Sequence, residues 1–332
     1  MSTHHETDLR VRVVARTEAA ADVVVLELAP AGETALPRWS AGAHVDVVVG
    51  ASSPADPVDD TGGEAGEDVR QYSLMGAVTA PSWSIGVLRE EDGSGGSRWL
   101  HDEVAVGDVL RVAGPRNHFE FEPVRGTRCL FVAGGIGITP ISAMVAAAER
   151  AGVEWELHYA GRSRRSMALV DELATAHPGR VHVYAADEGR RLDLTALYAG
   201  LPPFTVTYCC GPARLIEAIE VAATGRQLKV ERFVAREVGA PQRSEPFEVE
   251  LAYSGTTLVV PPDRSVLEVI EESGTLVLSS CQSGTCGTCE TRVLEGEVDH
   301  RDSILTPDEQ AANDVMYVCV SRAVSPRLVL EL

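Results

Sequence analysis

The sequence SSCQSGTCGTC at residues 279–289 carries three cysteines, and a fourth follows at Cys319. The spacing Cys281-x4-Cys286-x2-Cys289 with one distant partner is typical of a [2Fe–2S] cluster held by four thiolates. The two glycines between these cysteines let the backbone wrap closely around a compact inorganic group. Nearby backbone N–H groups and small hydroxyls can donate hydrogen bonds to the negatively charged sulfurs. The stretch therefore predicts an iron–sulfur site with these four cysteines as ligands.

Other uses of these cysteines fit the sequence less well. Structural zinc sites usually combine two short C-x2–4-C pairs, whereas here the fourth cysteine stands alone. Disulfides are disfavoured because the cysteine count of seven is odd and the first residues lack the features of a secretory signal. We therefore expect a cytoplasmic protein, since iron–cysteine sites survive in a reducing compartment.

Composition limits the possible partners. The 332 residues are enough for two or three domains, and no apolar run is long enough to span a membrane. A formal net charge of −20 argues against binding to nucleic acid, whose phosphates would be repelled. The acidic charge either keeps the protein soluble or steers its encounter with a basic electron-accepting partner.

The periodicity of the chain changes twice. Residues 11–122 contain short segments rich in β-branched residues, which predict a small antiparallel β-barrel, with a surface loop at 50–68. Residues 128–233 alternate strands and helices and predict a doubly wound α/β unit with a parallel sheet. We expect the domains to be residues 1–123, 124–234 and 247–332, with a linker at 235–246.

Glycine-rich turns mark two further candidate sites. AGGIGITP at residues 133–140 follows a buried strand and opens a helix, where backbone N–H groups can approach a pyrophosphate. A tight structural turn is the alternative. RQYS at residues 70–73 offers an arginine for a phosphate, a tyrosine for a flat ring and a serine for a ring nitrogen, or is ordinary strand surface. GGS at residues 95–97 either holds a phosphate at a helix start or forms a glycine hairpin.

These motifs, together with GPRN at residues 114–117 and YCCGP at 208–212, occur in one order along nearly the whole chain. In this order the chain resembles the ferredoxin–NADP reductase superfamily, and within it the phthalate dioxygenase reductase and vanillate demethylase reductase branch. The resemblance implies a β-barrel flavin domain, an NAD(P)-binding α/β domain and a C-terminal β-grasp ferredoxin domain with the [2Fe–2S] cluster.

The resemblance also implies roles for individual residues. Arg70, Tyr72 and Ser73 would hold the flavin, with Ser73 close to its N5 atom, and Gly95, Gly96 and Ser97 would take the flavin phosphate. Gly134, Gly135, Gly137 and Thr139 would line the nicotinamide nucleotide, while Cys210 and Gly211 would lie beside the nicotinamide. Phe233 would lie near the flavin ring. Ser73 and Cys210 are thus the candidate catalytic residues.

As an activity, the resemblance implies an NAD(P)H-dependent oxidoreductase that serves as the reductase component of an oxygenase system. FMN is expected, with FAD as the alternative, and NADH is expected, although arginines at residues 162–165 leave NADPH open. The partner would be a Rieske non-haem iron oxygenase or a cytochrome P450, served by a monomeric reductase. The alternative is a redox-sensing or electron-carrier iron–sulfur flavoprotein without an oxygenase partner.

Overall fold

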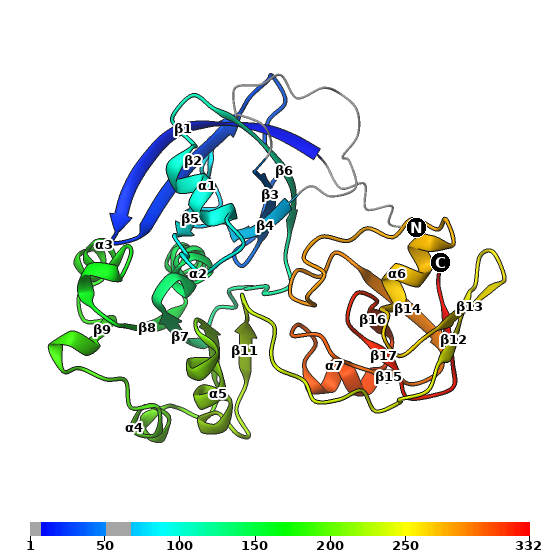
Figure 1. The fold of residues 1–332 in the computed structure, drawn as a ribbon. Helices are drawn as coiled ribbons and strands as arrows, with labels where there is room; N and C mark the ends of the chain where they lie inside the picture. The colour runs from blue at the N-terminus through cyan, green and yellow to red at the C-terminus, as the bar shows by residue number, and fades with distance from the viewer. Residues whose placement is uncertain (1–7, 51–67) are drawn as a thin grey trace. The chain divides into compact units, whose positions relative to one another are not determined.

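The computed structural model describes residues 8–50 and 68–332, so most of the predicted surface loop lies outside the described residues. The chain divides into two compact units, Met1–Glu231 and Arg232–Leu332 (Figure 1). The first unit contains a six-stranded antiparallel sheet and a five-stranded parallel sheet, and the second contains a five-stranded mixed sheet and a two-stranded sheet. No helix among the described residues is long and apolar enough to cross a membrane.

The antiparallel sheet has six strands in the order β4-β3-β6-β1-β2-β5. Their bounds are β1 (Asp8–Ala20), β2 (Val23–Pro30), β3 (His44–Val49), β4 (Asp68–Ser73), β5 (Trp83–Leu88) and β6 (Val109–Arg116). Leu74, just past β4, bridges to Ile85 on β5, so the two edges of the sheet meet and close the predicted barrel. Residues with little or no exposure, such as Val13, Leu26 and Trp83, fill its interior. The short helix α1 (Gly96–Asp102) follows β5.

The parallel sheet has the order β11-β10-β7-β8-β9. Its strands are β7 (Arg128–Gly134), β8 (Glu154–Gly161), β9 (Val181–Ala185), β10 (Thr205–Cys210) and β11 (Leu228–Glu231), and its helices are α2 (Ile138–Ala151), α3 (Val170–Ala176), α4 (Leu194–Gly200) and α5 (Ala213–Ala222). Alternate residues of β7 face opposite sides. Phe131 packs in one core with α2, whereas Leu130 and Val132 pack in another with α4 and α5. The doubly wound prediction is therefore confirmed.

Helix α3 does not begin directly after the loop that follows β8. A 3-10 turn, Arg164–Ser166, precedes it, and Leu169 at the N-cap has a φ of 59°. A branched residue in this left-handed region interrupts helical geometry, so α3 starts only at Val170.

The two sheets of the first unit share a core. Phe121, which follows β6, packs edge-on against Phe131 and Tyr208 with ring centroids 5.5 and 5.1 Å apart. Aromatic pairs in this arrangement add stability beyond the area that they bury. This shared aromatic core explains why the barrel and the parallel sheet form one compact unit.

The second unit is built on the order β13-β12-β18-β14-β16. Its strands are β12 (Phe247–Leu251), β13 (Thr256–Val260), β14 (Glu290–Glu295), β15 (Val298–Asp299), β16 (Val315–Tyr317), β17 (Arg322–Ala323) and β18 (Arg327–Leu330), with helices α6 (Val266–Glu272) and α7 (Pro307–Ala312). Ser265 and Glu268 form a capping box at the start of α6, and Val266 and Ile270 of α6 join the core of this sheet.

The segment at residues 235–246 is hydrogen-bonded to the second unit. The backbone N–H of Arg236 donates to Ser303 Oγ at 2.9 Å, and that of Gln242 donates to Asp299 Oδ2 at 3.1 Å. Arg301 donates to the carbonyl of Gly239 at 2.6 Å. A segment expected from its composition to be a linker thus lies along the surface of one unit.

Candidate electron-transfer site

The cysteine loop lies between α6 and β14 and is shaped by local hydrogen bonds to sulfur. Cys281 Sγ accepts from the backbone N–H groups of Ser283 at 3.4 Å and Thr285 at 3.5 Å. Cys286 Sγ accepts from the N–H of Cys281 at 3.5 Å. At Gly284, with a φ of +71°, an added Cβ would lie 2.7 Å from Val320 Cγ2 and 3.1 Å from Asp302 Cα. The loop therefore requires glycine there and points N–H groups at its sulfurs.

The fourth cysteine reaches the loop through the pairing of β14 with β16. Glu290 pairs with Tyr317, and the N–H of Val318 donates to the carbonyl of Cys289 at 3.4 Å. This register brings Cys319 beside Cys289, although thirty positions separate them in the sequence. The returning fourth ligand is thus a consequence of strand pairing.

The four thiols contact one another in pairs. Hydrogen bonding to Cys286 lowers the pKa of Cys281 to about 3, and hydrogen bonding to Cys289 lowers that of Cys319. The same bonds raise the pKa values of Cys286 and Cys289. Burial by itself would raise the pKa of each thiol, so the lowered values of Cys281 and Cys319 come mainly from the thiol with which each one pairs.

This pairing fits two irons better than one zinc ion. Tetrahedral zinc with Zn–S bonds of about 2.3 Å would gather all four sulfurs about 3.8 Å apart. Within residues 8–50 and 68–332, no three cysteine sulfurs lie within 4.8 Å of one another. A [2Fe–2S] cluster with four cysteines takes two thiolates on each iron, which matches the pairs Cys281–Cys286 and Cys289–Cys319.

On the barrel, Arg70 of β4 lies against the start of α1. A Cβ added at Gly96 would lie 2.9 Å from Arg70 Cγ, and Arg70 donates to Ser94 Oγ and forms an ion pair with Asp68. A Cβ at Gly95, which has a φ of +108°, would contact only Arg98 Nη2 at 3.7 Å. The guanidinium groups of Arg70 and Arg98 thus lie beside the open turn at Gly95 and Gly96, a combination suited to binding a phosphate.

The other residues of the RQYS motif differ in exposure. Ser73 ends β4, is 5% exposed and pairs with His44 of β3. Tyr72 packs partly against the barrel core, and burial raises its pKa well above the ordinary value. Its hydroxyl is therefore a neutral donor over the physiological pH range. Ser97 is turned toward the protein, since its Oγ accepts from the N–H of Glu90 at 3.1 Å.

The glycine-rich turn after β7 packs directly on the turn after β10. A Cβ at Gly137 would lie 2.3 Å from the carbonyl oxygen of Cys210, and one at Gly134 would lie 2.7 Å from Pro212 Cδ. Gly135, with a φ of +53°, has no neighbouring atom within 4 Å of a built Cβ. Thr139 links this turn to the barrel, because a Cβ at Gly86 of β5 would lie 2.7 Å from Thr139 Cγ2. The structure brings the predicted nucleotide residues together beside the barrel.

Cys210 ends β10 and is fully buried. Its Sγ lies 3.8 Å from Glu231 Oε2, at the end of the neighbouring strand β11. Burial raises the pKa of Cys210, so the thiol is neutral, and burial also raises the pKa of Glu231 to about 8. Gly211 packs against Gly134, because a Cβ added at Gly211 would lie 2.9 Å from Gly134 Cα.

Some residues near these motifs had no signal in the sequence analysis. Arg98 and Glu231 are brought to the motifs by a helix start and by strand pairing, neither of which a motif search registers. Phe233, predicted near the flavin, belongs to the second unit, where its side chain is 41% exposed.

Comparison with known proteins places these features in a family. A family model described as "2Fe-2S iron-sulfur cluster binding domain" matches residues 249–324. The phthalate 4,5-dioxygenase oxygenase reductase subunit of Pseudomonas putida is 37% identical over 97% of this chain and 96% of its own. The chain belongs to the phthalate dioxygenase reductase family. The phenoxybenzoate dioxygenase subunit beta of Ectopseudomonas oleovorans is 39% identical over 100% of this chain and 99% of its own.

Solved structures agree with this assignment. The structure of phthalate dioxygenase reductase, described as modular for electron transfer from pyridine nucleotides to [2Fe–2S], matches with a TM-score of 0.65, 34% identity and 98% coverage of both chains. An intact type IV self-sufficient cytochrome P450 monooxygenase matches with a TM-score of 0.87 and 42% identity. That match covers 98% of the present chain but only 41% of the longer monooxygenase chain.

The family settles the class of activity. The reductase is a flavin- and [2Fe–2S]-dependent oxidoreductase that takes electrons from a pyridine nucleotide. The expected fold, with a flavin barrel, a nucleotide-binding α/β sheet and a C-terminal ferredoxin sheet, is confirmed.

Proposed function

We propose that this reductase passes electrons from NADH through FMN and its [2Fe–2S] cluster to a terminal oxygenase. The observation that carries the proposal is end-to-end similarity to phthalate dioxygenase reductase, together with a cysteine set paired for two irons. The flavin accepts a hydride and the cluster carries one electron at a time when these groups are bound. We take the domains as residues 1–123, 124–234 and 247–332, with 235–246 between the last two.

In this proposal the protein binds and orients the cofactors. Arg70 neutralises the flavin phosphate at the Gly95–Gly96 turn, with Arg98 as a second cation, and Ser97 fixes the turn through Glu90. Tyr72 and Ser73 would hold the flavin ring by contact and hydrogen bonding. For Phe233, the family resemblance alone implies a place near the ring.

The nucleotide residues have separate tasks. Gly135 leaves room for the pyrophosphate, while Gly134, Gly137 and Gly211 allow the two turns to touch. Thr139 joins the nucleotide turn to the barrel at Gly86. Cys210 would lie beside the nicotinamide; burial raises the pKa of its thiol, so the neutral side chain would shape the site without adding a charge there. Cys281, Cys286, Cys289 and Cys319 hold the cluster.

The acceptor is a Rieske non-haem iron oxygenase or a cytochrome P450. Relatives named as dioxygenase subunits favour the first, and the self-sufficient cytochrome P450 monooxygenase favours the second. We further propose that the reductase is cytoplasmic and monomeric. Its acidic composition suits a basic docking face on the acceptor.

One experiment separates this function from a redox sensor or a simple carrier. The purified holoprotein is mixed with NADH or NADPH, and reduction of cytochrome c is followed under steady-state conditions. We expect sustained turnover with a preference for NADH, and acid extraction should release FMN. Absence of turnover at full flavin and iron loading would refute the reductase proposal, whereas release of FAD would correct only the flavin assignment.

A further inference from the structure

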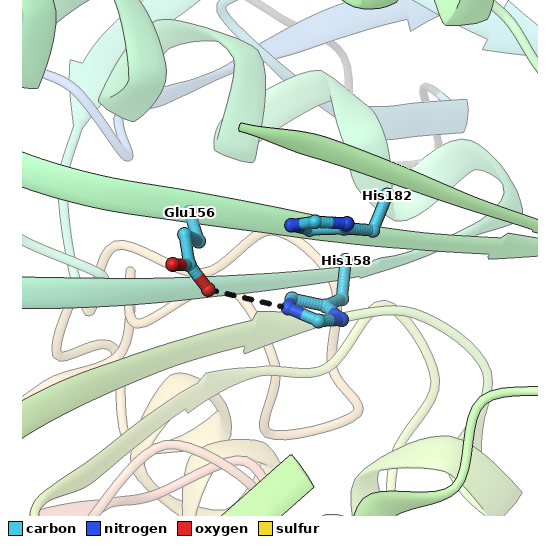
Figure 2. A group of neighbouring side chains, drawn as sticks. All are labelled: Glu156, His158 and His182. Atoms are coloured by element: carbon cyan, nitrogen blue, oxygen red, sulfur yellow. Dashed lines mark ion pairs between the residues drawn. The ribbon is translucent and has the colours of Figure 1, made fainter. Parts of the chain in front are cut away.

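Three side chains of types that can bind a metal ion lie together on the parallel sheet, and none of them is among the residues assigned to the cofactors. Figure 2 shows these three side chains. Glu156 and His158 are two positions apart on β8 and so share one face. His182 on the edge strand β9 pairs with His158 across the ladder. One ligand atom from each of the three side chains lies within 4.8 Å of the other two.

The buried histidine of this cluster has one ring nitrogen without a hydrogen bond. His158 is 6% exposed, and its Nδ1 lies 3.0 Å from the hydroxyl of Tyr184. Its Nε2 is buried, has no hydrogen-bond partner and lies 3.7 Å from Glu156 Oε2, too far for a hydrogen bond. Leaving a buried polar atom unpaired is costly. With Nδ1–H donating to the Tyr184 hydroxyl, the Nε2 lone pair points toward the Glu156 carboxylate and can bind a cation.

The cluster keeps one carboxylate oxygen directed at its histidines. Glu156 Oε1 accepts from Arg128 at 2.6 Å, and its Oε2 is the oxygen on the side of the histidines. A further cation, Arg190, lies over the ring of Tyr184 at 5.7 Å.

We propose that Glu156, His158 and His182 bind one divalent transition-metal ion of the zinc type. Two imidazoles and one carboxylate form a known zinc ligand set with a fourth position for water, and the Tyr184 hydroxyl fixes the ring of His158 as an outer partner does in metal sites. The ion would link β8 to β9, the edge strand of the sheet. The site is independent of the proposed electron path.

Binding requires the ligands to move closer together. Zinc bonds of about 2.0–2.1 Å place tetrahedral ligand atoms about 3.3 Å apart, whereas His158 Nε2 and Glu156 Oε2 are now 3.7 Å apart and all three ligand atoms lie within 4.8 Å of one another. His182 and Glu156 can supply this movement, because both are only half-buried. The two imidazoles are stacked with centroids 4.6 Å apart, so the ring of His182 must also rotate to direct a nitrogen at the ion. His158, held by Tyr184, would be the fixed ligand.

The test is zinc binding by the holoprotein, measured by calorimetric titration and by zinc K-edge X-ray absorption. His4→Gln and His5→Gln are introduced first, so that the histidine pair near the N-terminus does not contribute. We expect one zinc per chain with only nitrogen and oxygen neighbours at about 2.0–2.1 Å. His182→Gln should weaken binding by at least about 10-fold, since loss of an outer partner alone costs about 10–100-fold. Glu156→Gln should weaken it in the same direction.

The control is His177→Gln, which removes a histidine that packs on Trp155 outside the cluster and should leave zinc affinity unchanged. Flavin and iron contents equal to those of the parent protein show that each variant is folded. Sulfur neighbours at about 2.3 Å would mean that zinc had entered the cysteine loop and would overturn the proposal. Unchanged affinity in the His182 variant, or no zinc uptake by the parent protein, would also overturn it.

Discussion

Replacing Gly137 with alanine tests whether contact between the two turns controls nucleotide binding. Gly137 has a φ of −60° and a ψ of −4°, which alanine adopts without strain. The added Cβ would lie 2.3 Å from the carbonyl oxygen and 2.4 Å from the carbonyl carbon of Cys210, and 2.6 Å from Gly211 N. All three atoms belong to the backbone, so the clash cannot be relieved by a side-chain rotation.

The size of the effect follows from these contacts. Ordinary van der Waals contact begins near 3.4 Å, so the turns must separate by about 1 Å at this point. Overpacking of this kind costs about 1–3 kcal/mol, and a misplacement of about 1 Å in a reacting pair can cost about 100-fold in rate. We expect Gly137→Ala to weaken NADH binding and slow flavin reduction by about 10–100-fold, with flavin and iron contents unchanged.

Stopped-flow flavin reduction at increasing NADH concentration separates the dissociation constant from the reduction rate. Gly200→Ala is the matched control, because Gly200 closes α4 in the same unit and a Cβ there has no neighbour within 4 Å. Each substitution replaces one hydrogen with a methyl group, but only the methyl group at position 137 would clash with backbone atoms. If Gly137→Ala reduces its flavin as the parent protein does, contact between the turns does not govern the site.

Three further outcomes are expected. Gly96→Ala places a Cβ 2.8 Å from Val49 Cγ2 and 2.9 Å from Arg70 Cγ. The affinity for the flavin should therefore fall about 10-fold, which is measured by the flavin that stays bound after gel filtration. Full retention would argue against a phosphate at this turn. Cys286→Ser should remove the cluster, seen by iron analysis, while NADH still reduces the flavin; loss of both would contradict separate modules. Because the pKa of His158 falls from 6.5 to about 4 on folding, unfolded chains bind the extra proton as pH drops. Metal-free protein should thus lose up to about 3 kcal/mol of stability between pH 6.5 and 4. His158→Gln should flatten this part of the urea-denaturation profile, and an unchanged profile would refute the assignment.

The cluster ligands were predictable because three of them are local in sequence. Cys281, Cys286 and Cys289 lie in one loop whose shape depends on Gly284 and on N–H groups a few positions away. The parallel sheet was predictable for a similar reason, since β7 is a short continuous apolar run and α2 is an alanine-rich segment with a proline in its first turn. Sequence patterns of this kind predict only those structural features that residues close together in the chain determine.

The features missed by the sequence analysis depend on register between distant strands. His158 and His182 meet only because β8 and β9 pair in one particular alignment, and a shift by one residue would place them on opposite faces. The meeting of Cys210 with Glu231 has the same origin in the pairing of β10 with β11. The segment at residues 235–246 was interpreted from its glycine and prolines, but side chains more than fifty positions away determine where it lies.

The glycine-rich turn shows how one motif serves two physical purposes. All its glycines were expected to line the nucleotide, because backbone approach to a pyrophosphate requires the absence of side chains. Gly135 has the positive φ and the open surroundings that such an approach needs. At Gly134 and Gly137 a side chain would face the turn after β10 and meet backbone, Pro212 or Leu215. Alanine at Gly135 would therefore strain the backbone at the ligand, while alanine at Gly137 would separate two protein segments. The same residue type is required at neighbouring positions for different reasons, and only the packing of β7 beside β10 distinguishes them.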